Sequence, residues 1–439
     1  MRSVWKEIAD APAFPRLDRD LKVDTLIIGG GMAGVLTAYM LKKAGVEHVL
    51  CEAETLGSGT TGNTTAKITS QHGLIYDKLI REFDERKARQ YYQANQEALE
   101  AYGALSKSID CDFERKDNYI YLREDDEKLE REMAAVKKLG IPAQRVKELP
   151  LPFRVAGAIR FFDQAQFHPL RFLQGISDGL PIYEHTRVRE LKKTREGIEA
   201  VTSGGTILAK RVVVATHFPF LNKHGAYFIK QHQHRSSVIA LENGPKLDGM
   251  YLDDDEKGLS FRTYGDLLFV GGGSHRTGKQ GGGQNELRDI ARQYFPQASI
   301  RYAWAAQDCM TLDTVPYIGR YSSGTEGLYV ATGFNKWGMT GSMVAAKLVC
   351  DLLTGEKNPY EALFSPSRTI LRPALMSNAA HALLGLITPT APRCPHLGCA
   401  LHWNEQEHSW DCPCHGSRFG ADGALIDNPA TGDLKAVRR

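Results

Sequence analysis

The sequence lacks several features that mark specialised classes of protein. No run of 18 apolar residues occurs, so no membrane-spanning helix is expected. The first 17 residues are polar and contain Trp5 and two prolines, and therefore lack the apolar centre of a signal peptide. No repeat of 20–50 residues and no low-complexity tract is present. We therefore expect a globular protein of the cytoplasm.

Clustered charge is also missing, whereas cysteine is clustered. The net charge is +3 and the basic residues are spread along the chain, which argues against a nucleic-acid-binding face. Four of the eight cysteines are scattered, and we expect them to be buried reduced thiols: Cys51, Cys111, Cys309 and Cys350. The other four lie between positions 394 and 414. In a cytosolic protein such a cluster favours a metal centre over a disulfide framework.

A glycine-rich turn lies between a predicted strand and a predicted helix near the N-terminus. Asp24–Ile28 is typical of a buried parallel strand, Gly29–Gly34 (GGGMAG) matches G-x-G-x-x-G, and Val35–Lys43 has helical spacing. His48–Cys51 is predicted to be a second strand, which leads into Glu52. These features occur in the order typical of a dinucleotide-binding unit.

Each part of this unit has a physical role. Gly29 permits the tight turn, Gly31 lets the backbone approach a pyrophosphate, and Gly34 allows the helix to pack closely on the strand. The helix N-terminus offers N–H groups to the phosphates. Glu52 lies where a carboxylate binds ribose hydroxyls. The fingerprint alone does not distinguish NAD from FAD.

Later segments favour FAD. Gly57–Lys67 (GSGTTGNTTAK) is a loop of small hydrogen-bonding residues, suited to cover the diphosphate and the flavin edge. Arg211–Thr216 and Gly327–Gly333 are predicted to be further buried strands, and Phe334–Leu353 a Gly-containing apolar helix. A chain that returns to its nucleotide domain near residue 330 fits FAD, because this long cofactor must be held across the whole domain.

Roughly residues 20–360 resemble the D-amino-acid oxidase and glycine oxidase superfamily of FAD enzymes. The resemblance rests on the turn, Glu52, the GSGTTGNTTAK loop, Asp313–Gly319 and the GLYVATGFNKWGMTGS segment. It implies oxidation of C–N bonds of amines or amino acids by hydride transfer to FAD, which we expect to be non-covalent because the loop has no His or Cys. The predicted cofactor-binding residues are Gly29, Gly31, Gly34, Glu52, Gly59, Thr60, Thr61, Asn63, Thr64, Gly333, Met339 and Thr340.

The resemblance also implies a mixed-sheet substrate domain in the middle of the chain, where residues 76–109 have a helical pattern. An arginine there is suited to clamp a carboxylate, and aromatic rings to enclose an amine. A solvated or ion-pairing role is the alternative for each arginine. The candidate pocket residues are Arg235, Arg262, Tyr264, His275, Lys336 and Trp337. Of these, the predicted catalytic residues are Arg262, Tyr264, Lys336 and Trp337.

A QHQH run at 231–234 is a weaker metal candidate. A strand would put His232 and His234 on one face. No carboxylate or third ligand is near in the sequence, so a polar strand is preferred.

Two short boxes near the C-terminus, CPHLGC (394–399) and CPCHGS (412–417), each combine Cys with His. The predicted ligands of a [2Fe–2S] cluster are Cys394, His396, Cys412 and His415, with one Cys and one His from each loop. Gly398 and Gly416 permit tight loops. A Cys₂His₂ zinc site is the alternative, but neither half has zinc-finger spacing.

These boxes resemble the Rieske proteins of respiratory and photosynthetic cytochrome complexes. The resemblance implies a Cys399–Cys414 disulfide, with reduced thiols as the alternative, and a hydrogen bond from Ser417 to a bridging sulfide. Phe419 stands where those proteins carry Tyr, so we expect a potential below the top of the Rieske range of about −150 to +300 mV. A base sheet before the first box is largely missing. The cluster segment would therefore dock directly on the flavin domain, or hold a labile cluster.

The predicted fold is α/β: a Rossmann-like FAD-binding domain with an inserted mixed-sheet (α+β) substrate domain, followed by a small all-β Rieske segment. The oxidoreductase domain is expected over 1–365, the linker over 366–391 and the abbreviated Rieske [2Fe–2S] domain over 392–439. Within the first domain, the expected FAD-binding parts are about 20–75, 180–220 and 310–362, and the substrate-binding parts about 76–179 and 221–309.

The whole chain resembles FAD-dependent oxidoreductases with a C-terminal Rieske domain, and its similarity to gamma-glutamylputrescine oxidoreductases implies an amine or amino-acid substrate. The leading hypothesis is C–N oxidation by FAD, with single electrons passing through the cluster to an external carrier. A reductase fed by a ferredoxin-like donor, and a redox-sensing or electron-transfer flavoprotein without a dedicated small substrate, remain as alternatives.

Overall fold

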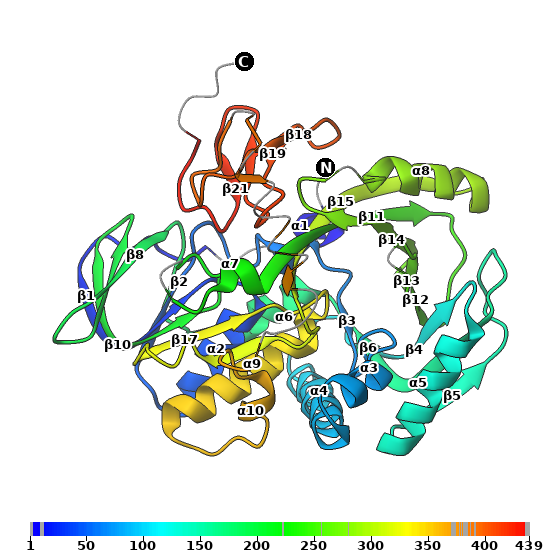
Figure 1. Ribbon diagram of the computed structural model, residues 1–439, viewed down its shortest axis with the longest axis horizontal. Helices are drawn as coiled ribbons and strands as arrows, with labels where there is room; N and C mark the ends of the chain where they lie inside the picture. Colours follow the sequence, from blue (N-terminus) through cyan, green and yellow to red (C-terminus); the bar gives the residue numbers. More distant parts are fainter. Residues whose placement is uncertain are drawn as a thin grey trace.

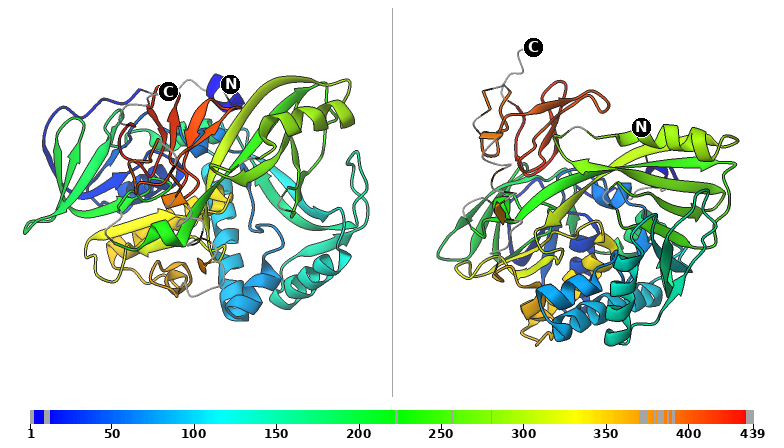
Figure 2. Two further views of the ribbon diagram at one scale, coloured as in Figure 1. Left: turned by 45° about the horizontal axis from the view of Figure 1, so that its top comes forward. Right: turned by 45° about the vertical axis from the view of Figure 1, so that its right-hand side comes forward.

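The computed structural model describes residues 3–8, 13–221, 224–255, 257–279, 281–369, 375–376, 378, 380, 385–386, 388–389 and 392–434. The described strands form three sheets, two in the long N-terminal part and one near the C-terminus (Figures 1 and 2). None of the helices in these ranges is long and apolar enough to cross a lipid bilayer.

The first sheet contains the predicted nucleotide-binding unit. Its strands are β1 (Leu21–Ile28), β2 (His48–Cys51), β7 (Ile182–Tyr183), β8 (Val188–Lys193), β9 (Ile198–Thr202), β10 (Thr206–Val214), β16 (Tyr317–Arg320) and β17 (Leu328–Thr332). The order is β16-β17-β10-β1-β2-β7, with β9 and β8 extending from β10. The central strands run parallel and are apolar because both faces are covered. Helices α2 (Met32–Lys43) and α9 (Gly338–Thr354) pack together beneath this sheet.

The second sheet is mixed, as expected for the inserted domain. Its strands are β3 (Lys67–Ile68), β4 (Glu114–Leu122), β5 (Ala143–Val146), β6 (Gly157–Gln166), β11 (Gln231–Glu242), β12 (Met250–Asp253), β13 (Ser260–Tyr264), β14 (Leu267–Arg276) and β15 (Ser299–Thr311). The order is β15-β11-β14-β13-β12-β4-β6-β3, and only the β12–β4 pair within this path is parallel. Helix α8 (Gly283–Tyr294) packs on β11 and β14.

The third sheet is a small antiparallel meander at the C-terminus. It runs β18 (His402–Asn404), β19 (Ser409–Asp411), β20 (Arg418–Gly420) and β21 (Leu425–Asp427) in sequence order. A buried cluster fills it, made of Cys394, Cys399, Leu401, Cys412, Cys414, Phe419 and Ala430. In Figures 1 and 2 this domain lies directly on β11 and the short helix α7 (Tyr227–Lys230).

The fold class predicted from the sequence is confirmed, with one local difference. The helical pattern over 76–109 forms two helices, α3 (Tyr76–Glu82) and α4 (Glu85–Leu105), because Asp84 caps the second by accepting from the amide of Lys87 (2.7 Å). Helix α5 (Asp126–Leu139) follows. Further short helices in the described ranges are α1 (Val4–Ile8), η1 (Thr60–Asn63), α6 (Pro169–Ser177) and α10 (Glu361–Phe364). Much of the predicted 366–391 linker lies outside the described residues.

Candidate active site and cluster site

The glycine turn joins β1 to α2 so closely that side chains are excluded. Gly29 has a φ of +112°, and its amide donates to the carbonyl of Cys51 (2.9 Å). A Cβ on Gly29 would lie 2.5 Å from the carbonyl oxygen of Ala215, and a Cβ on Gly34 would lie 1.9 Å from that of Gly29. The N-terminus of α2 therefore lies directly on the turn, which is the arrangement that brings a helix N-terminus to a pyrophosphate.

Glu52 follows β2 and reaches the same turn. Its Oε2 accepts from the amide of Gly30 (2.6 Å), and its Oε1 from the amide of Glu54 (2.8 Å). Burial raises the pKa of this carboxyl, and the two amide groups oppose that effect. The carboxyl is thus held in one orientation beside the glycine turn, where it is suited to bind ribose hydroxyls.

The Gly57–Lys67 loop is held in place by hydrogen bonds from three other segments. Thr61 Oγ1 accepts from the amide of Met32 at the start of α2 (3.0 Å). Trp5 of α1 donates its indole N–H to the carbonyl of Thr64 (2.7 Å), and Trp304 of β15 donates to that of Asn63 (2.9 Å). The loop is consequently fixed against the cavity that it borders.

The turn, Glu52 and the loop border one cavity of about 820 Å³, within the range of about 300–1,000 Å³ typical of ligand pockets. Nine of the twelve predicted cofactor-binding residues line it: Gly29, Gly31, Glu52, Gly59, Thr60, Thr61, Asn63, Thr64 and Met339. The side-chain-free turn beside a fixed carboxyl fits the dinucleotide half of FAD.

The other three predicted residues lie behind the cavity wall. Gly34 packs on the turn. Gly333 has a φ of +74°, and a Cβ there would lie 2.3 Å from the side chain of Thr311. Thr340 donates to the carbonyl of Thr69 (3.0 Å) and lies 3.0 Å from His72 Nε2. These residues shape the backbone around the site.

A wall of the cavity is formed by the mixed sheet and carries small polar and charged side chains. Lys336 Nζ donates to Ser274 Oγ (2.6 Å), which lies 3.5 Å from Ser236 Oγ. His234 of β11 lies opposite Asp308 of β15 in the strand register. Burial lowers the pKa of His234 to about 3 and raises that of Asp308 to about 6, while Lys336 opposes the shift at Asp308.

Two of the four predicted catalytic residues, Lys336 and Trp337, line the cavity. Asn335 and Lys336 have φ values of +51° and +72°, an uncommon backbone for residues other than glycine. The side chain of Asn335 supports this bend by donating to the carbonyl of Gly333 (2.6 Å) and accepting from the amide of Thr311 (2.7 Å). Trp337 stacks on His72, with ring centroids 4.8 Å apart.

The other two, Arg262 and Tyr264, do not line the cavity. Arg262 is fully buried and donates to the carbonyl of Ala66 (3.0 Å), with its guanidinium 5.4 Å from the ring of Phe269. Burial lowers its pKa to about 9. Tyr264 donates instead to Asp112 (2.5 Å). Their side chains thus support the backbone around β3 and β13 instead of bordering the cavity.

Two more of the candidate pocket residues also lie elsewhere. Arg235 forms a bidentate ion pair with Glu407 of the C-terminal domain, because Arg235, like Gln233, lies on the face of β11 that is turned away from the cavity. His275 Nδ1 lies 2.9 Å from the carbonyl of Gly273 in its own strand. Neither residue lines the cavity, and Arg235 has the ion-pairing role that was its alternative.

Sequence reasoning missed several cavity residues. The QHQH run is a polar strand, which was the preferred prediction. Because side chains alternate between the two faces of a strand, the sequence could have indicated that His234 and Gln233 face different sites. Asp308 carries no motif signal. Lys67 ends the predicted loop and lines the cavity, where burial lowers its pKa to about 7.

The two cysteine–histidine boxes form equivalent loops. In the first, the amide of Gly398 donates to the carbonyl of Cys394 (2.9 Å), and the amide of Cys394 to the carbonyl of Cys399 (2.8 Å). In the second, Gly416 donates to Cys412 (2.9 Å), and Cys412 to Ser417 (2.9 Å). Gly398 and Gly416 have φ values of +80° and +87°, as the predicted tight loops require.

The four predicted cluster ligands converge between these loops. A hydrogen bond from Cys412 lowers the pKa of the Cys394 thiol to about 7. The rings of His396 and His415 lie 4.9 Å apart, centroid to centroid. Both ring nitrogens of His415 are buried without a nitrogen or oxygen partner in the described part of the chain. Two thiols and two imidazoles that converge between two loops fit a [2Fe–2S] cluster of Rieske type.

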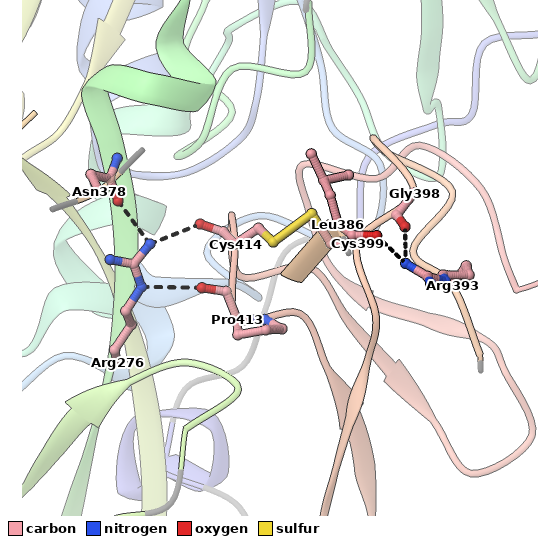
Figure 3. The surroundings of a disulfide bond; sticks show 8 residues. All are labelled: Arg276, Asn378, Leu386, Arg393, Gly398, Cys399, Pro413 and Cys414. Atoms are coloured by element: carbon pink, nitrogen blue, oxygen red, sulfur yellow. Dashed lines mark hydrogen bonds between the residues drawn. A yellow bond between two sulfur atoms is a disulfide. The ribbon is translucent and has the colours of Figure 1, made fainter. Parts of the chain in front are cut away.

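A disulfide joins Cys399 to Cys414, in agreement with the expected pairing, and ties the two loops together (Figure 3). The sulfurs of Cys399, Cys412 and Cys414 also lie within 4.8 Å of one another. Because two of these sulfurs are bonded to each other, only Cys412 of the three is suited to bind iron. The scattered cysteines are free thiols, as expected, although Cys350 is only partly buried.

One arginine and two glutamines of the N-terminal part hold the second cluster loop. Figure 3 shows Arg276 of β14 donating to the carbonyls of Pro413 and Cys414 (3.1 Å each). Gln233 of β11 donates to the carbonyl of His415 (2.8 Å), and Gln307 of β15 to that of Gly416 (2.8 Å). The cluster domain therefore docks directly on the mixed sheet. Direct docking on the flavin domain was one of the two expectations for a cluster segment without a base sheet; a labile cluster was the other.

A single strand thus borders both sites. Gln233 and Arg235 point from β11 to the cluster domain, whereas His234 and Ser236 line the cavity. This follows from the alternation of side chains along a strand. One face of β11 therefore presents polar side chains to the cavity, and the opposite face binds the cluster domain.

Comparison with known proteins agrees with both sites. Residues 24–352 match the family described as FAD dependent oxidoreductase, and residues 384–438 match the Rieske [2Fe-2S] domain. A protein of Bacillus subtilis (strain 168) named as a Rieske 2Fe-2S iron-sulfur protein, YhfW, is 37% identical over 99% of this chain and 97% of its own length.

Two further similarities cover mainly the N-terminal part. Gamma-glutamylputrescine oxidoreductase of Escherichia coli (strain K12) is 23% identical over 84% of this chain and 94% of its own length. The crystal structure of glycine oxidase from Geobacillus kaustophilus superposes with a TM-score of 0.67, covering 80% of this chain and 100% of that chain, at 21% identity. This last likeness shows the fold.

Proposed function

Because this chain belongs to the FAD dependent oxidoreductase family and carries a Rieske [2Fe-2S] domain, we propose that it oxidises a C–N bond of an amine or amino acid and passes electrons singly to an external acceptor. Bound FAD supplies hydride-accepting chemistry and a [2Fe–2S] cluster one-electron chemistry. The observation that carries the proposal is the position of β11: one face of this strand borders the cavity, and the other contacts the cluster loops. The names of two relatives, gamma-glutamylputrescine oxidoreductase and glycine oxidase, support the substrate class.

Asp308 is the proposed partner of the substrate nitrogen. Its carboxyl lies on the cavity wall, and its pKa of about 6 leaves it mainly ionised at neutral pH. An ionised carboxylate there can hold the substrate ammonium group and take one proton from it. A base whose pKa lies near the working pH is suited to this transfer.

Lys336 and Trp337 are the proposed groups for the rest of the substrate. The Lys336 ammonium, held by Ser274, offers a positive charge to a substrate carboxylate. The Trp337 ring, stacked on His72, provides an apolar surface and limits access of water. Together with Asp308 they favour a substrate that carries an amine and an acidic group.

The assignment of ligands and domains is part of the proposal. The cluster is assigned to Cys394, His396, Cys412 and His415, and FAD to the nine cavity residues named above. The oxidoreductase domain is assigned to 1–365, the linker to 366–391 and the cluster domain to 392–439. An external one-electron carrier in the cytoplasm would accept the electrons.

The test is anaerobic mixing of the purified holoprotein with a panel of amines and amino acids. Flavin absorbance is followed first, and the EPR signal of the cluster second. Bleaching of the flavin followed by a Rieske-type EPR signal is the expected result. Flavin reduction only by a reduced ferredoxin would replace the proposal by a reductase. No response to either donor would leave a redox-sensing or electron-transfer protein.

Asp308→Asn tests the proposed base. We expect this variant to slow flavin reduction at pH 7 by about 10²–10⁴-fold, the usual contribution of a general base. In the wild type the rate should rise with pH through about 6 as Asp308 ionises, and the variant should lose this rise. Glu190→Gln, an exposed change on β8, is the matched control. A variant with the pH profile of the wild type would exclude Asp308 as the base.

A further inference from the structure

The cavity assigned to FAD is not built by the N-terminal domain alone. The end of β21 and the loop that follows it in the cluster domain also line it, through Ile426, Asp427, Asn428, Ala430 and Thr431. We refer to residues 426–431 as the closing loop. Two domains that are separate in the sequence therefore share the wall of one cavity.

The closing loop lies at the dinucleotide edge of the sheet. The side-chain amide of Asn428 donates to the carbonyls of Thr216 (2.5 Å) and Phe218 (2.9 Å). These residues lie shortly after the end of β10 at Val214. Ala215, the first residue after β10, is the one whose carbonyl oxygen would lie 2.5 Å from a Cβ on Gly29. One side chain of the cluster domain is thus anchored two to four residues beyond the strand end that faces the glycine turn.

The closing loop is equally tied to the cluster site. The amide of Ala430 donates to Ser417 Oγ (3.0 Å), in the second cluster loop. The side-chain amide of Gln233 donates both to the carbonyl of His415 (2.8 Å) and to that of Asn428 (3.0 Å). A displacement of the second cluster loop would therefore be transmitted to the closing loop through these shared hydrogen bonds.

Two arginines hold the closing loop near its first residue, through Asp427. Asp427 accepts from Arg418 of β20 (3.1 Å) and lies 3.9 Å from Arg235 of β11. The side chains of both arginines are more than nine-tenths buried, at 4% and 7% exposure. Two cations, one from each domain, thus converge on Asp427, the second residue of the closing loop.

We propose that the cluster domain forms part of the FAD site: the closing loop covers the dinucleotide half of the cofactor, and FAD retention is coupled to the folded, cluster-bound state of that domain. The coupling is reciprocal, because a ligand that favours the docked state is itself favoured by it. This inference goes beyond the proposed function, since it holds for either direction of electron flow and for any substrate.

Asn428→Ala in the full-length holoprotein tests the closing loop. Dissociation of FAD is measured after dilution, by the rise in fluorescence of released flavin, with no substrate present. Loss of two hydrogen bonds at the domain boundary is expected to raise the dissociation rate by about tenfold. Gln406→Ala is the matched control, because Gln406 also bonds across the interface, to the carbonyl of Gly282 (3.4 Å), but does not line the cavity.

Iron and sulfide are quantified in both variants. Faster FAD release in Asn428→Ala, with or without loss of iron, supports the inference provided that Gln406→Ala releases FAD at the wild-type rate. FAD release within twofold of the wild type in Asn428→Ala overturns the role of the closing loop.

Cys412→Ser tests the coupling by removing a cluster ligand. We expect iron-free protein that releases FAD faster than the wild type, and wild-type protein stripped of FAD that loses iron to a chelator faster than the holoprotein. Unchanged rates in both directions would overturn the coupling. Because neither readout involves turnover, failure here is distinguishable from failure of the proposed oxidation.

Discussion

Hydrogen bonds from single residues tune the sulfur ligands of the cluster site. The hydrogen bond from Cys412 has the largest effect in lowering the pKa of the free Cys394 thiol, but it is lost when both thiolates bind iron. The amide of His396 and the hydroxyl of Ser417 lower the same pKa and can still donate to a bound thiolate. Phe419 is fully buried in the same hydrophobic cluster as Cys394 and Cys412 but has no hydroxyl to offer. Donors to the ligands and sulfides raise the potential of an iron–sulfur cluster because they stabilise its more negative, reduced form.

Phe419→Tyr should therefore raise the reduction potential. A net hydrogen bond worth about 0.5–1.5 kcal/mol corresponds to about 20–65 mV for a one-electron couple. The measurement is a redox titration followed by EPR, with Phe162→Tyr on the exposed side of β6 as control. An unchanged potential in a variant that keeps its iron would show that the added hydroxyl does not reach the ligand sulfur.

Contacts between elements far apart in the sequence decide how the mixed domain is assembled. Glu132 of α5 is buried and accepts from the amides of Tyr76 and Asp77 at the start of α3 (2.8 Å each). Burial raises the pKa of this carboxyl to about 7. A residue from one helix thus satisfies backbone groups that the other helix cannot satisfy itself.

Glu132→Gln should lower the free energy of unfolding by about 1–3 kcal/mol, because one buried amide loses its acceptor. The pH dependence has a definite sign. The folded-state pKa is raised, so the contribution of the protonated carboxyl to stability is fully present below the ordinary pKa of 4.5 and is lost as pH rises through about 7. The variant lacks this loss.

Thermal unfolding at pH 5 and pH 8 checks this prediction. The difference in melting temperature between wild type and Glu132→Gln should be larger at pH 5. Glu130→Gln, on the exposed face of the same helix, is the control. Equal differences at the two pH values would mean that Glu132 does not titrate in this window.

At the scale of the whole molecule, a buried ion network locks the cluster domain onto the mixed sheet. Glu407 accepts from Arg235 of β11 (2.6 Å) and from Arg418 of β20 (2.9 Å). Arg418 also pairs with Asp411 (2.9 Å). Because the network spans both domains, it favours one fixed docking geometry over independent movement of the cluster domain.

Glu407→Gln should loosen this docking. Breaking a buried pair costs about 3–5 kcal/mol, and the lower end applies because the Glu407 side chain is 24% exposed. Amide hydrogen exchange in β18–β21 should accelerate, whereas exchange in the first sheet should be unchanged. Glu405→Gln, two residues away and exposed, is the matched control. Equal exchange rates in the two variants would show that the network does not fix the docking of the cluster domain.

Prediction from the sequence succeeded where the chemistry is local. The glycine turn, Glu52 and the Gly57–Lys67 loop lie within 45 residues of one another, and they border the same cavity. Prediction was weaker for side chains whose direction depends on strand register. Arg235 and Arg262 were expected at the substrate, yet one crosses to the other domain and the other is enclosed by aromatic rings.

The sequence alone determined the family, the nucleotide turn and the two cysteine–histidine loops, because each is specified by residue types at short, fixed spacings. Only the tertiary structure decided which face of β11 meets the cavity, that Asp308 and Lys336 share its wall, and that Asn428 of the second domain also lines it. These contacts join residues up to about 210 positions apart. No local pattern encodes them, because they follow from how the sheets pack and in which register their strands pair.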